Sequence, residues 1–365
     1  MSDIIYDIMH MDRRVARIDT SGRCKIYFPS FMPYHLYLED TSADVNILVN
    51  NVTNFYYWCA TRILTLDRTY AKEILNSIGM NQAVTDRERA RIALSYRCAS
   101  LTDVFWVKEH AERVSFSDIN LYDNHLSNAF IDISLRGRQY TVDNGNLARD
   151  LSTNGCFPKA WKRVEGGFLL LKDGGEDAVK RELLASRVAR CFDLSQVLYE
   201  EDMFDGERVT VSENITSKEY SIVPMESFEI YSLNHGRNTR KYILNLDRHN
   251  YYMMNIIDYL VGNTDRHWGN WGVLVRNAVN KPVCLHPLMD FNQAFYSYDT
   301  PDGANCQTLF GRKANQREAA QEAVQRIGLN QSAEVKREVF SELPEYYDMF
   351  KQRLSILKEE KTVDL

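Results

Sequence analysis

An apolar helix that runs into a short polar loop constrains this chain more than any other stretch of it. Residues 251–261 (YYMMNIIDYLV) have the apolar spacing of a buried helix, and Gly262 stands where a glycine ends such a helix. The loop that follows carries Asp265, His267 and Asn270, and a second apolar run then predicts a strand. Loops held between rigid elements are where catalytic side chains usually lie. We therefore expect a functional site in this loop.

A second carboxylate follows, because residues 283–291 (VCLHPLMDF) read as a strand that ends in Asp290. Phosphoryl transfer needs little covalent chemistry from a protein, but it needs metal ions and positioning. In such a site one aspartate orients the attacking hydroxyl, an asparagine holds a metal, and a second aspartate holds the metals that bridge the phosphates. Asp265, Asn270 and Asp290 stand in that order, and their oxygen ligands suit Mg²⁺. A solvated polar loop that matches by chance is the plainer alternative.

The sequence GNTDRHWGNWG followed by PLMDF resembles the catalytic and metal-binding segments of HipA-like kinases, the bacterial serine/threonine kinases of toxin–antitoxin systems. The resemblance implies that Asp265 and His267 are catalytic and that Asn270 and Asp290 bind metal. It implies ATP and Mg²⁺ as cofactors. It also implies a protein substrate and a possible antitoxin partner.

The resemblance covers about residues 150–355 and no motif within residues 1 to about 100. Two positions depart from the family pattern. His286 precedes the proline of the metal strand, where a small apolar residue is common, and Asn292 stands third in the metal triplet in place of glycine. Both departures leave the metal ligands in place and bear on the flexibility and regulation of the loop.

A loop and a strand upstream match the nucleotide half of such a site. Glycine and small hydroxyl residues let backbone N–H groups approach phosphate oxygens. They occur here as Ser152, Thr153, Asn154 and Gly155. The strand-like GGFLLLKDG that follows carries Lys172, which the resemblance assigns to the α- and β-phosphates. The resemblance also makes Ser152 and Thr153 candidates for inhibitory autophosphorylation. Taken alone, the stretch reads as an ordinary hairpin in which these hydroxyls only cap the turn.

Two further groups complete the predicted nucleotide site. Residues 177–192 have the apolar stripe of an amphipathic helix, and Glu182 is the candidate partner of Lys172. A solvated face is the alternative for that glutamate. Residues 220–228 (YSIVPMESF) read as a strand that leaves the small lobe, and the resemblance implies that backbone groups of a hinge there contact adenine. The candidate hinge residues are Met225, Glu226 and Ser227.

Composition narrows the function classes. The chain carries 44 Lys and Arg against 50 Asp and Glu, a formal net charge of −6, so we expect no direct nucleic-acid binding. The seven cysteines are scattered and never in C-x-x-C spacing, which argues against a disulfide framework and fits a reducing cytoplasm. No run approaches the about 18 apolar residues of a transmembrane helix, and the first residues lack the pattern of a secretory signal. We expect a cytoplasmic protein without membrane contact.

Together with the resemblance, the order of these features predicts an α+β chain with a bilobal, protein-kinase-like fold. Residues 1–100 read as an additional N-terminal α+β module, and residues 101–149 as a connector packed on the kinase body. Residues 150–228 are assigned to a small β-rich lobe and residues 229–365 to a larger helical lobe. Two other functions stay open. A phosphoinositide kinase shares the D-R-H-x-x-N order, although no polybasic run is found for an anionic membrane. A catalytically silent, kinase-shaped binding module is opposed by the complete set of motif residues.

Overall fold

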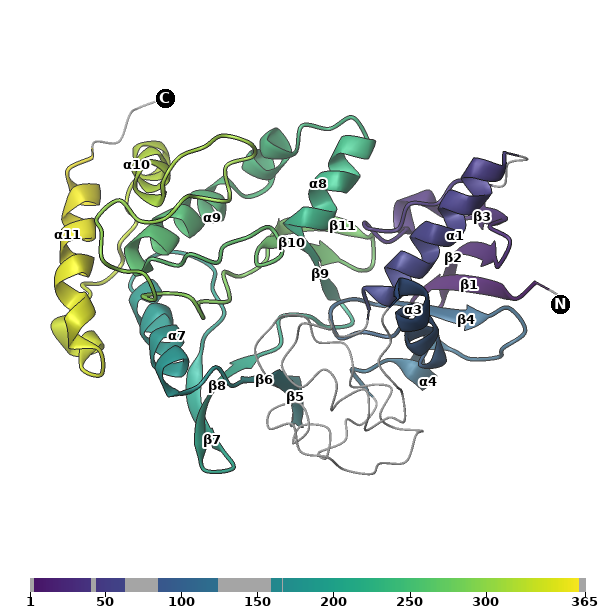
Figure 1. Ribbon diagram of the computed structural model, residues 1–365, viewed down its shortest axis with the longest axis horizontal. Helices are drawn as coiled ribbons and strands as arrows, with labels where there is room; N and C mark the ends of the chain where they lie inside the picture. The colour runs from purple at the N-terminus through teal and green to yellow at the C-terminus, as the bar shows by residue number, and fades with distance from the viewer. Residues whose placement is uncertain (1–2, 41–43, 63–84, 124–158, 166, 361–365) are drawn as a thin grey trace. The chain divides into compact units, whose positions relative to one another are not determined.

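The structure, a computed structural model, describes residues 3–40, 44–62, 85–123, 159–165 and 167–360 of the 365-residue chain (Figure 1). The predicted phosphate loop, Ser152, Thr153, Asn154 and Gly155, lies outside the described residues. The chain divides into two compact units. The first comprises residues 1–172, 216–222 and 275–281, and the second comprises residues 173–215, 223–274 and 282–365.

The first unit is built on a four-stranded antiparallel sheet in the order β3-β2-β1-β4. Its strands are β1 (Ile5–His10), β2 (Arg13–Asp19), β3 (Cys24–Ile26) and β4 (Phe105–Glu109). Its described helices are α1 (Val45–Ala60), α3 (Asp86–Ser95) and α4 (Phe116–Ile119), with a 3-10 turn η1 (Pro29–Phe31). Helices α1 and α3 pack against each other and lie beside one face of the sheet (Figure 1).

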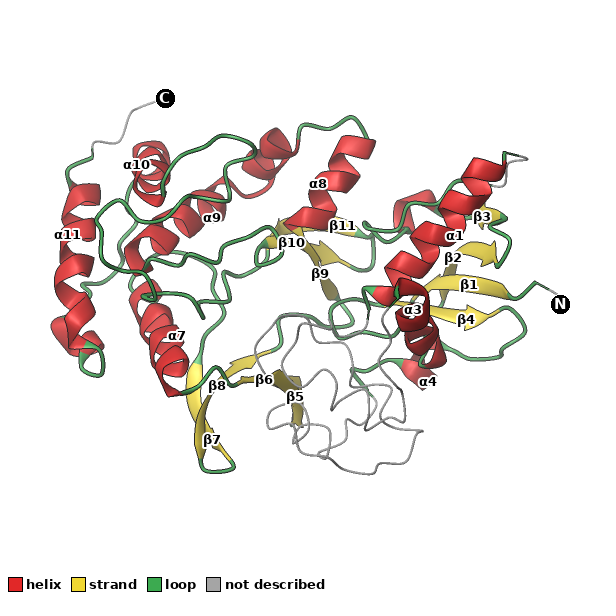
Figure 2. Ribbon diagram, in the orientation of Figure 1, coloured by secondary structure: helices red, strands yellow, loops and turns green. Residues whose placement is uncertain are grey.

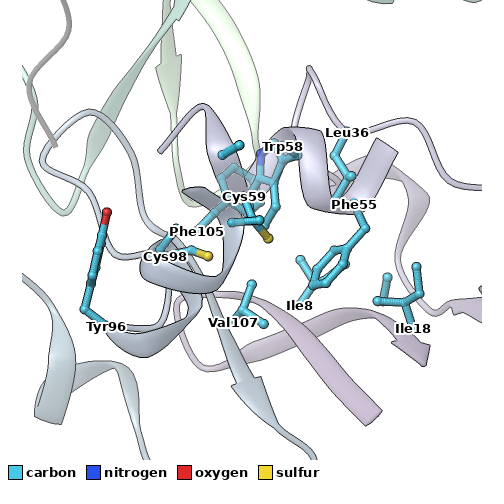
Figure 3. Close-up of a cluster of buried hydrophobic side chains, with 14 of the residues drawn as sticks. Ile8, Ile18, Leu36, Phe55, Trp58, Cys59, Tyr96, Cys98, Phe105 and Val107 are labelled. Carbon is cyan, nitrogen blue, oxygen red and sulfur yellow. The ribbon is translucent and has the colours of Figure 1, made fainter. Parts of the chain in front are cut away.

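The core of this unit forms between the sheet and helix α1. Ile8 of β1 and Ile18 of β2 are fully buried, and they belong to the same cluster as Phe55 and Trp58 of α1 (Figure 3). Full burial of one such side chain contributes about 1.5–3 kcal/mol relative to exposure. The described cysteines are free thiols, in keeping with the scattered cysteine spacing of the sequence.

A second apolar cluster joins this sheet to a hairpin much later in the chain. The antiparallel hairpin consists of β5 (Lys159–Val164) and β6 (Gly167–Lys172). Phe168 of β6 packs in one cluster with Met9 of β1 and Trp106 of β4. The sheet therefore takes a strand from residues 101–149, which the sequence assigned to a connector. The strand that ends in Lys172 likewise belongs to the same unit as the N-terminal residues.

A buried ion pair lies just beyond the end of α1. The guanidinium of Arg62 donates to both carboxylate oxygens of Asp103, over 2.7 and 2.9 Å, and also to the carbonyl of Cys98. The same guanidinium lies 4.8 Å from the ring centre of Trp58. Burial opposes the charge of Asp103, but the charge and hydrogen bonds of Arg62 outweigh it and hold the pKa of this carboxyl below its usual range.

The second unit is mostly helical (Figure 2). Its described helices are α7 (Glu176–Ala189), α8 (Met225–Asn234), α9 (Thr239–Val261), α10 (Gln316–Ile327) and α11 (Tyr347–Lys358), with 3-10 turns η2 (Arg337–Phe340) and η3 (Pro344–Tyr346). A hairpin of β7 (Glu200–Phe204) and β8 (Glu207–Glu213) follows α7. Helix α9 packs against both α10 and α11. No described helix of the chain is both long enough and apolar enough to cross a bilayer.

A three-stranded sheet in the order β11-β10-β9 contains three of the five points where the chain passes from one unit to the other. Its strands are β9 (Tyr220–Pro224), β10 (Gly272–Arg276) and β11 (Lys281–Leu285). The predicted catalytic loop connects α9 to β10 and lies within the second unit.

The end of α9, which leads into that loop, is held by side chains from later in the chain. Gly262 ends the helix in the left-handed conformation (φ 61°), as the sequence predicts, and a Cβ there would lie 2.5 Å from a ring carbon of Tyr298. Arg353 of α11 is fully buried and donates to the carbonyls of Tyr259 and Thr300, each over 2.6 Å. Its guanidinium also lies 4.2 Å from the ring centre of Tyr298. The negative end of the helix dipole and this ring therefore stabilise the buried charge of Arg353.

We expect the Asp103→Ala variant to lower the free energy of unfolding of the first unit by about 3–5 kcal/mol, because it leaves the Arg62 charge buried without its partner. Urea unfolding of the full-length chain, followed by tryptophan fluorescence, measures the loss. Asp40→Ala is the matched control, since Asp40 pairs with Lys25 at a site where both side chains are more than half exposed. Equal shifts in the two variants would contradict a stabilising role for the buried pair.

Candidate active site

In the predicted catalytic loop, the side-chain amide of Asn270 donates hydrogen bonds to Asp265. The Nδ2 of Asn270 donates to the backbone carbonyl of Asp265 over 2.9 Å and to its Oδ2 over 3.4 Å. The N–H of Asp265 donates to the Oδ1 of Asn263 over 3.3 Å. Among the described residues none donates to the Oδ1 of Asn270, so this oxygen can serve as a metal ligand. The structure thus brings Asp265 and Asn270 together.

The ring of His267 faces Asp265 across the loop. The N–H of Gly269 donates to Nδ1 of His267 over 3.0 Å, so the proton of the neutral ring lies on Nε2. That Nε2 is 3.9 Å from the Oδ1 of Asp265. A Cβ at Gly269 would lie 2.8 Å from the ring of His267, so glycine is what leaves room for this ring position. The side chains of His267 and Asp265 are 49% and 40% exposed, so an acceptor hydroxyl can approach them from solvent.

Asp290 lies beyond the strand on which the sequence placed it. Strand β11 ends at Leu285, so the prediction of a strand that ends in Asp290 is wrong. Asp290 instead adopts the left-handed conformation (φ 63°), which is uncommon for a residue other than glycine. Its N–H donates to the Oη of Tyr199 over 3.0 Å, and its carbonyl accepts from the Nδ2 of Asn263 over 3.2 Å. Two side chains from other segments therefore fix the backbone that aims this carboxylate.

A buried arginine ties the loop to the segment of Asp290. Arg266 forms a bidentate ion pair with Asp258 of α9, with Nε to Oδ2 at 2.9 Å and Nη2 to Oδ1 at 3.1 Å. Its Nη1 donates to the carbonyls of Asn270 and Met289, over 2.8 and 2.5 Å. The side chains of Arg266 and Asp258 are 3% and 6% exposed. One guanidinium thus fixes both the asparagine of the loop and the residue before Asp290.

The surroundings of Asp265 raise the pKa of its carboxyl. Burial has the largest effect, the charge of His267 opposes it, and the neighbouring carboxylate of Asp290 adds to it. The net result is a pKa above the usual range. A carboxylate of raised pKa is a better proton acceptor, which suits a group that receives the proton of an attacking hydroxyl.

The oxygen donors of the site fit Mg²⁺. The amide oxygen of Asn270 and the carboxylate of Asp290 are hard ligands, and Mg²⁺ is commonly held by one or two carboxylates together with substrate phosphates. In the described part of the chain, no group of three or more His, Cys, Asp or Glu side chains could hold a metal by itself. The Oδ1 of Asn292 is buried and has no hydrogen-bond partner among the described residues. An orphan acceptor two residues from Asp290 is suited to a water of the metal's hydration shell.

Lys172 and Glu182 fall in different units, so their predicted pairing stays a prediction. Lys172 is the last residue of β6 and is 9% exposed. Glu182 lies in the first half of α7, is 3% exposed, and accepts a hydrogen bond from the Oγ1 of Thr210 over 2.6 Å. The alternative of a solvated face is therefore wrong for Glu182. A carboxylate buried at this depth requires such partners.

Residues 225–227 do not continue the strand that the sequence predicts across 220–228. Strand β9 ends at Pro224, and Met225 begins α8. The N–H of Met225 donates to the carbonyl of Trp271 over 2.8 Å, and the N–H of Glu226 donates to the carbonyl of Trp268 over 3.1 Å. These two donors are already engaged. Adenine contact by the remaining backbone groups of Met225, Glu226 and Ser227 stays a prediction.

Sequence reasoning missed the residues that hold the site together: Asp258, Asn263, Arg266 and Tyr199. Asp258 carried a usable signal, because a single carboxylate inside an apolar helix has to be buried with a partner. Arg266, eight positions later, was the obvious partner to test.

We expect Arg266→Met to cost about 3–5 kcal/mol of unfolding free energy, because the carboxylate of Asp258 is left buried without its counter-charge. The double variant Asp258→Leu, Arg266→Met should recover much of this loss, since it removes both charges. Urea unfolding of the second unit measures these changes. Arg317→Met is the matched control, because Arg317 pairs with Asp302 at the surface, where a pair is worth about 0–1 kcal/mol. A double variant no more stable than Arg266→Met would contradict this account.

No protein-family model and no curated protein matches the sequence of this chain. The HipA protein of Shewanella oneidensis MR-1, solved in a toxin–antitoxin complex with HipB and operator DNA, aligns over 99% of this chain and 100% of its own. The TM-score is 0.56 and the sequence identity 11%. The proinflammatory kinase CtkA of Helicobacter pylori aligns over 57% of this chain and 89% of its own, with a TM-score of 0.43 and 15% identity. The match to HipA establishes the fold: the chain has the mixed α and β architecture of a HipA-like kinase fold.

Proposed function

We propose that this protein is an ATP- and Mg²⁺-dependent kinase that phosphorylates a serine or threonine of a protein. The observation that carries the proposal is the contact of one buried arginine, Arg266, with the backbone beside Asn270 and Asp290, in the loop that also bears Asp265. A fold by itself does not determine a function, so the proposal rests on this arrangement within a HipA-like fold.

Each side chain of the site has a part in the proposed reaction. Asp265 orients the acceptor hydroxyl and takes up its proton, which its raised pKa favours. The Nε2 of His267 lies beside the carboxylate of Asp265, and His267 opposes the rise in the pKa of Asp265. Asn270 and Asp290 hold Mg²⁺, which when bound neutralises charge that develops on the transferred phosphoryl group. Lys172 contacts the α- and β-phosphates of ATP.

The proposal includes control by a second protein and by phosphorylation. HipA was solved together with HipB and operator DNA, and from the likeness of fold we propose an antitoxin-type protein partner for this chain. Autophosphorylation of Ser152 or Thr153 would add a charge of about −1.5 to −2 to a loop that receives ATP phosphates, and so would weaken nucleotide binding. A cytoplasmic location and the absence of nucleic-acid contact stay predictions.

We expect Asp265→Ala and Asp290→Ala each to lower the rate of phosphoryl transfer by at least about a hundredfold, as loss of a preorganised polar group does in other enzymes. The assay incubates each purified full-length protein with γ-labelled ATP, Mg²⁺ and cell lysate, and identifies the labelled band or lipid. Asp299→Ala is the control, because Asp299 is an exposed carboxylate of the same segment. Transfer by either variant at the wild-type rate would overturn the assignment, and label in lipid alone would favour a phosphoinositide kinase.

The raised pKa of Asp265 predicts how the rate depends on pH. A protonated carboxyl accepts no proton, so kcat should fall as the pH drops through a pKa that lies above the usual range of aspartate. A protonated His267 ring lowers this pKa through its positive charge, so the loss of that charge in His267→Gln should move the acid limb of the profile to higher pH. Profiles of kcat from pH 4 to 8 test the shift. An acid limb that moves to lower pH in His267→Gln contradicts the assignment of Asp265 as the proton acceptor.

A further inference from the structure

We propose that Tyr199 is a positioning residue that couples helix α7 to the conformation of Asp290 and thereby sets the affinity of the site for its metal. The inference rests on the proposed function, because that function assigns Asp290 to the metal. Tyr199 lies between α7 and β7, outside every motif of the sequence, and is 4% exposed.

The backbone conformation of Asp290 is unfavourable and has to be stabilised by other residues. A residue with a Cβ disfavours the left-handed region because the Cβ crowds the neighbouring carbonyl. Such a residue persists there only where its surroundings over-determine it. At Asp290 (φ 63°) the phenolic oxygen of Tyr199 accepts from the N–H, and the amide of Asn263 donates to the carbonyl. Both backbone polar groups are thus engaged by side chains.

The hydroxyl of Tyr199 is delivered by a ring that is itself fixed. The ring packs edge-on against Phe291, with 6.3 Å between the ring centres and an angle of 73° between the planes. Phe291 is fully buried and directly follows Asp290. Tyr199 therefore contacts both residues of the Asp-Phe pair, one through its hydroxyl and one through its ring.

The backbone of Tyr199 is hydrogen-bonded to α7 and to the residue that follows it. Its N–H donates to the Oγ of Ser186 over 3.3 Å, and its carbonyl accepts from the Nη2 of Arg190 over 3.1 Å. Ser186 is fully buried and lies on the same helix as Glu182. A displacement of α7 therefore moves Tyr199, and with it the acceptor that holds the N–H of Asp290.

The coupling has a defined consequence for the metal. When the acceptor is lost, Asp290 can return to the right-handed region, and the direction of its carboxylate changes. The two protein ligands then no longer meet at one ion. Metal affinity falls, whereas groups that contact only the nucleotide are unchanged.

The test replaces Tyr199 with phenylalanine, which removes the hydroxyl and keeps the ring. Mn²⁺ binding to the full-length protein is measured by electron paramagnetic resonance in the presence of ADP, and the half-saturating Mg²⁺ concentration is measured in the kinase assay. Loss of one hydrogen bond predicts that both values rise by about 3- to 10-fold. The KM for ATP at saturating Mg²⁺ should change by less than about twofold, because a positioning role acts through the metal alone.

Two further variants serve as a control and as a second test of the coupling. Tyr347→Phe is the matched control, since among the described residues the hydroxyl of Tyr347 has no hydrogen bond, and it should bind Mn²⁺ as the parent does. Ser186→Ala removes one of the two hydrogen bonds that hold the backbone of Tyr199, leaves that to Arg190 and keeps Tyr199 intact, so it should weaken Mn²⁺ binding in the same direction and by less. This variant decides the matter should Tyr199→Phe fail to fold.

The outcomes separate the inference from the proposed function. A wild-type protein that binds no Mn²⁺ with ADP overturns the proposed metal site and the inference with it. A wild-type protein that binds Mn²⁺, with Tyr199→Phe binding it equally well, overturns the inference alone. A rise in the ATP KM that equals the rise in half-saturating Mg²⁺ shows a general structural effect and also overturns it.

Discussion

The bidentate ion pair of Arg266 with Asp258 is the contact on which the rest of the candidate site depends. Two charges withdrawn from water are stabilised only when their geometry is good and their remaining hydrogen bonds are made. Here the planar fork meets both carboxylate oxygens, and the remaining nitrogen donates to the carbonyls of Asn270 and Met289. The geometry that makes this ion pair stable therefore also sets the spacing between the loop of Asp265 and the segment of Asp290. Lysine in place of Arg266 could not meet it, because an ammonium has no rigid fork.

The N-terminal residues belong to the same unit as Lys172, the lysine predicted to bind nucleotide. Phe168, on the strand that ends in Lys172, shares an apolar cluster with Met9 and Trp106. The position of the lysine strand is consequently fixed by packing against the first and fourth strands of the N-terminal sheet. The strand that ends in Lys172 therefore depends on a core that begins near residue 5.

Local sequence patterns predict helix ends and contacts within one loop, but they do not predict contacts between residues far apart in the sequence. The sequence predicts correctly that Gly262 ends its helix, because a helix end that requires the left-handed conformation favours glycine at that one position. The meeting of Asp265 and Asn270 followed from their spacing in a single loop. The strand at Asp290 was predicted wrongly, since an apolar run looks the same whether or not it stays paired in a sheet. The contact of Asp290 with Tyr199 joins residues 91 positions apart and leaves no local pattern.

The buried guanidinium of Arg353 has a consequence for the biosynthesis of the protein. It reaches the carbonyl of Tyr259, 94 residues earlier, and so completes the end of the helix that leads into the loop of Asp265. At translation rates of about 5–20 residues per second, Arg353 is added roughly 5 to 20 seconds after Tyr259, the residue whose carbonyl it binds. A nascent chain that has exposed α9 but not α11 therefore lacks one support of the loop of Asp265. The loop of Asp265 therefore receives one of its supports only after α11 has been synthesised.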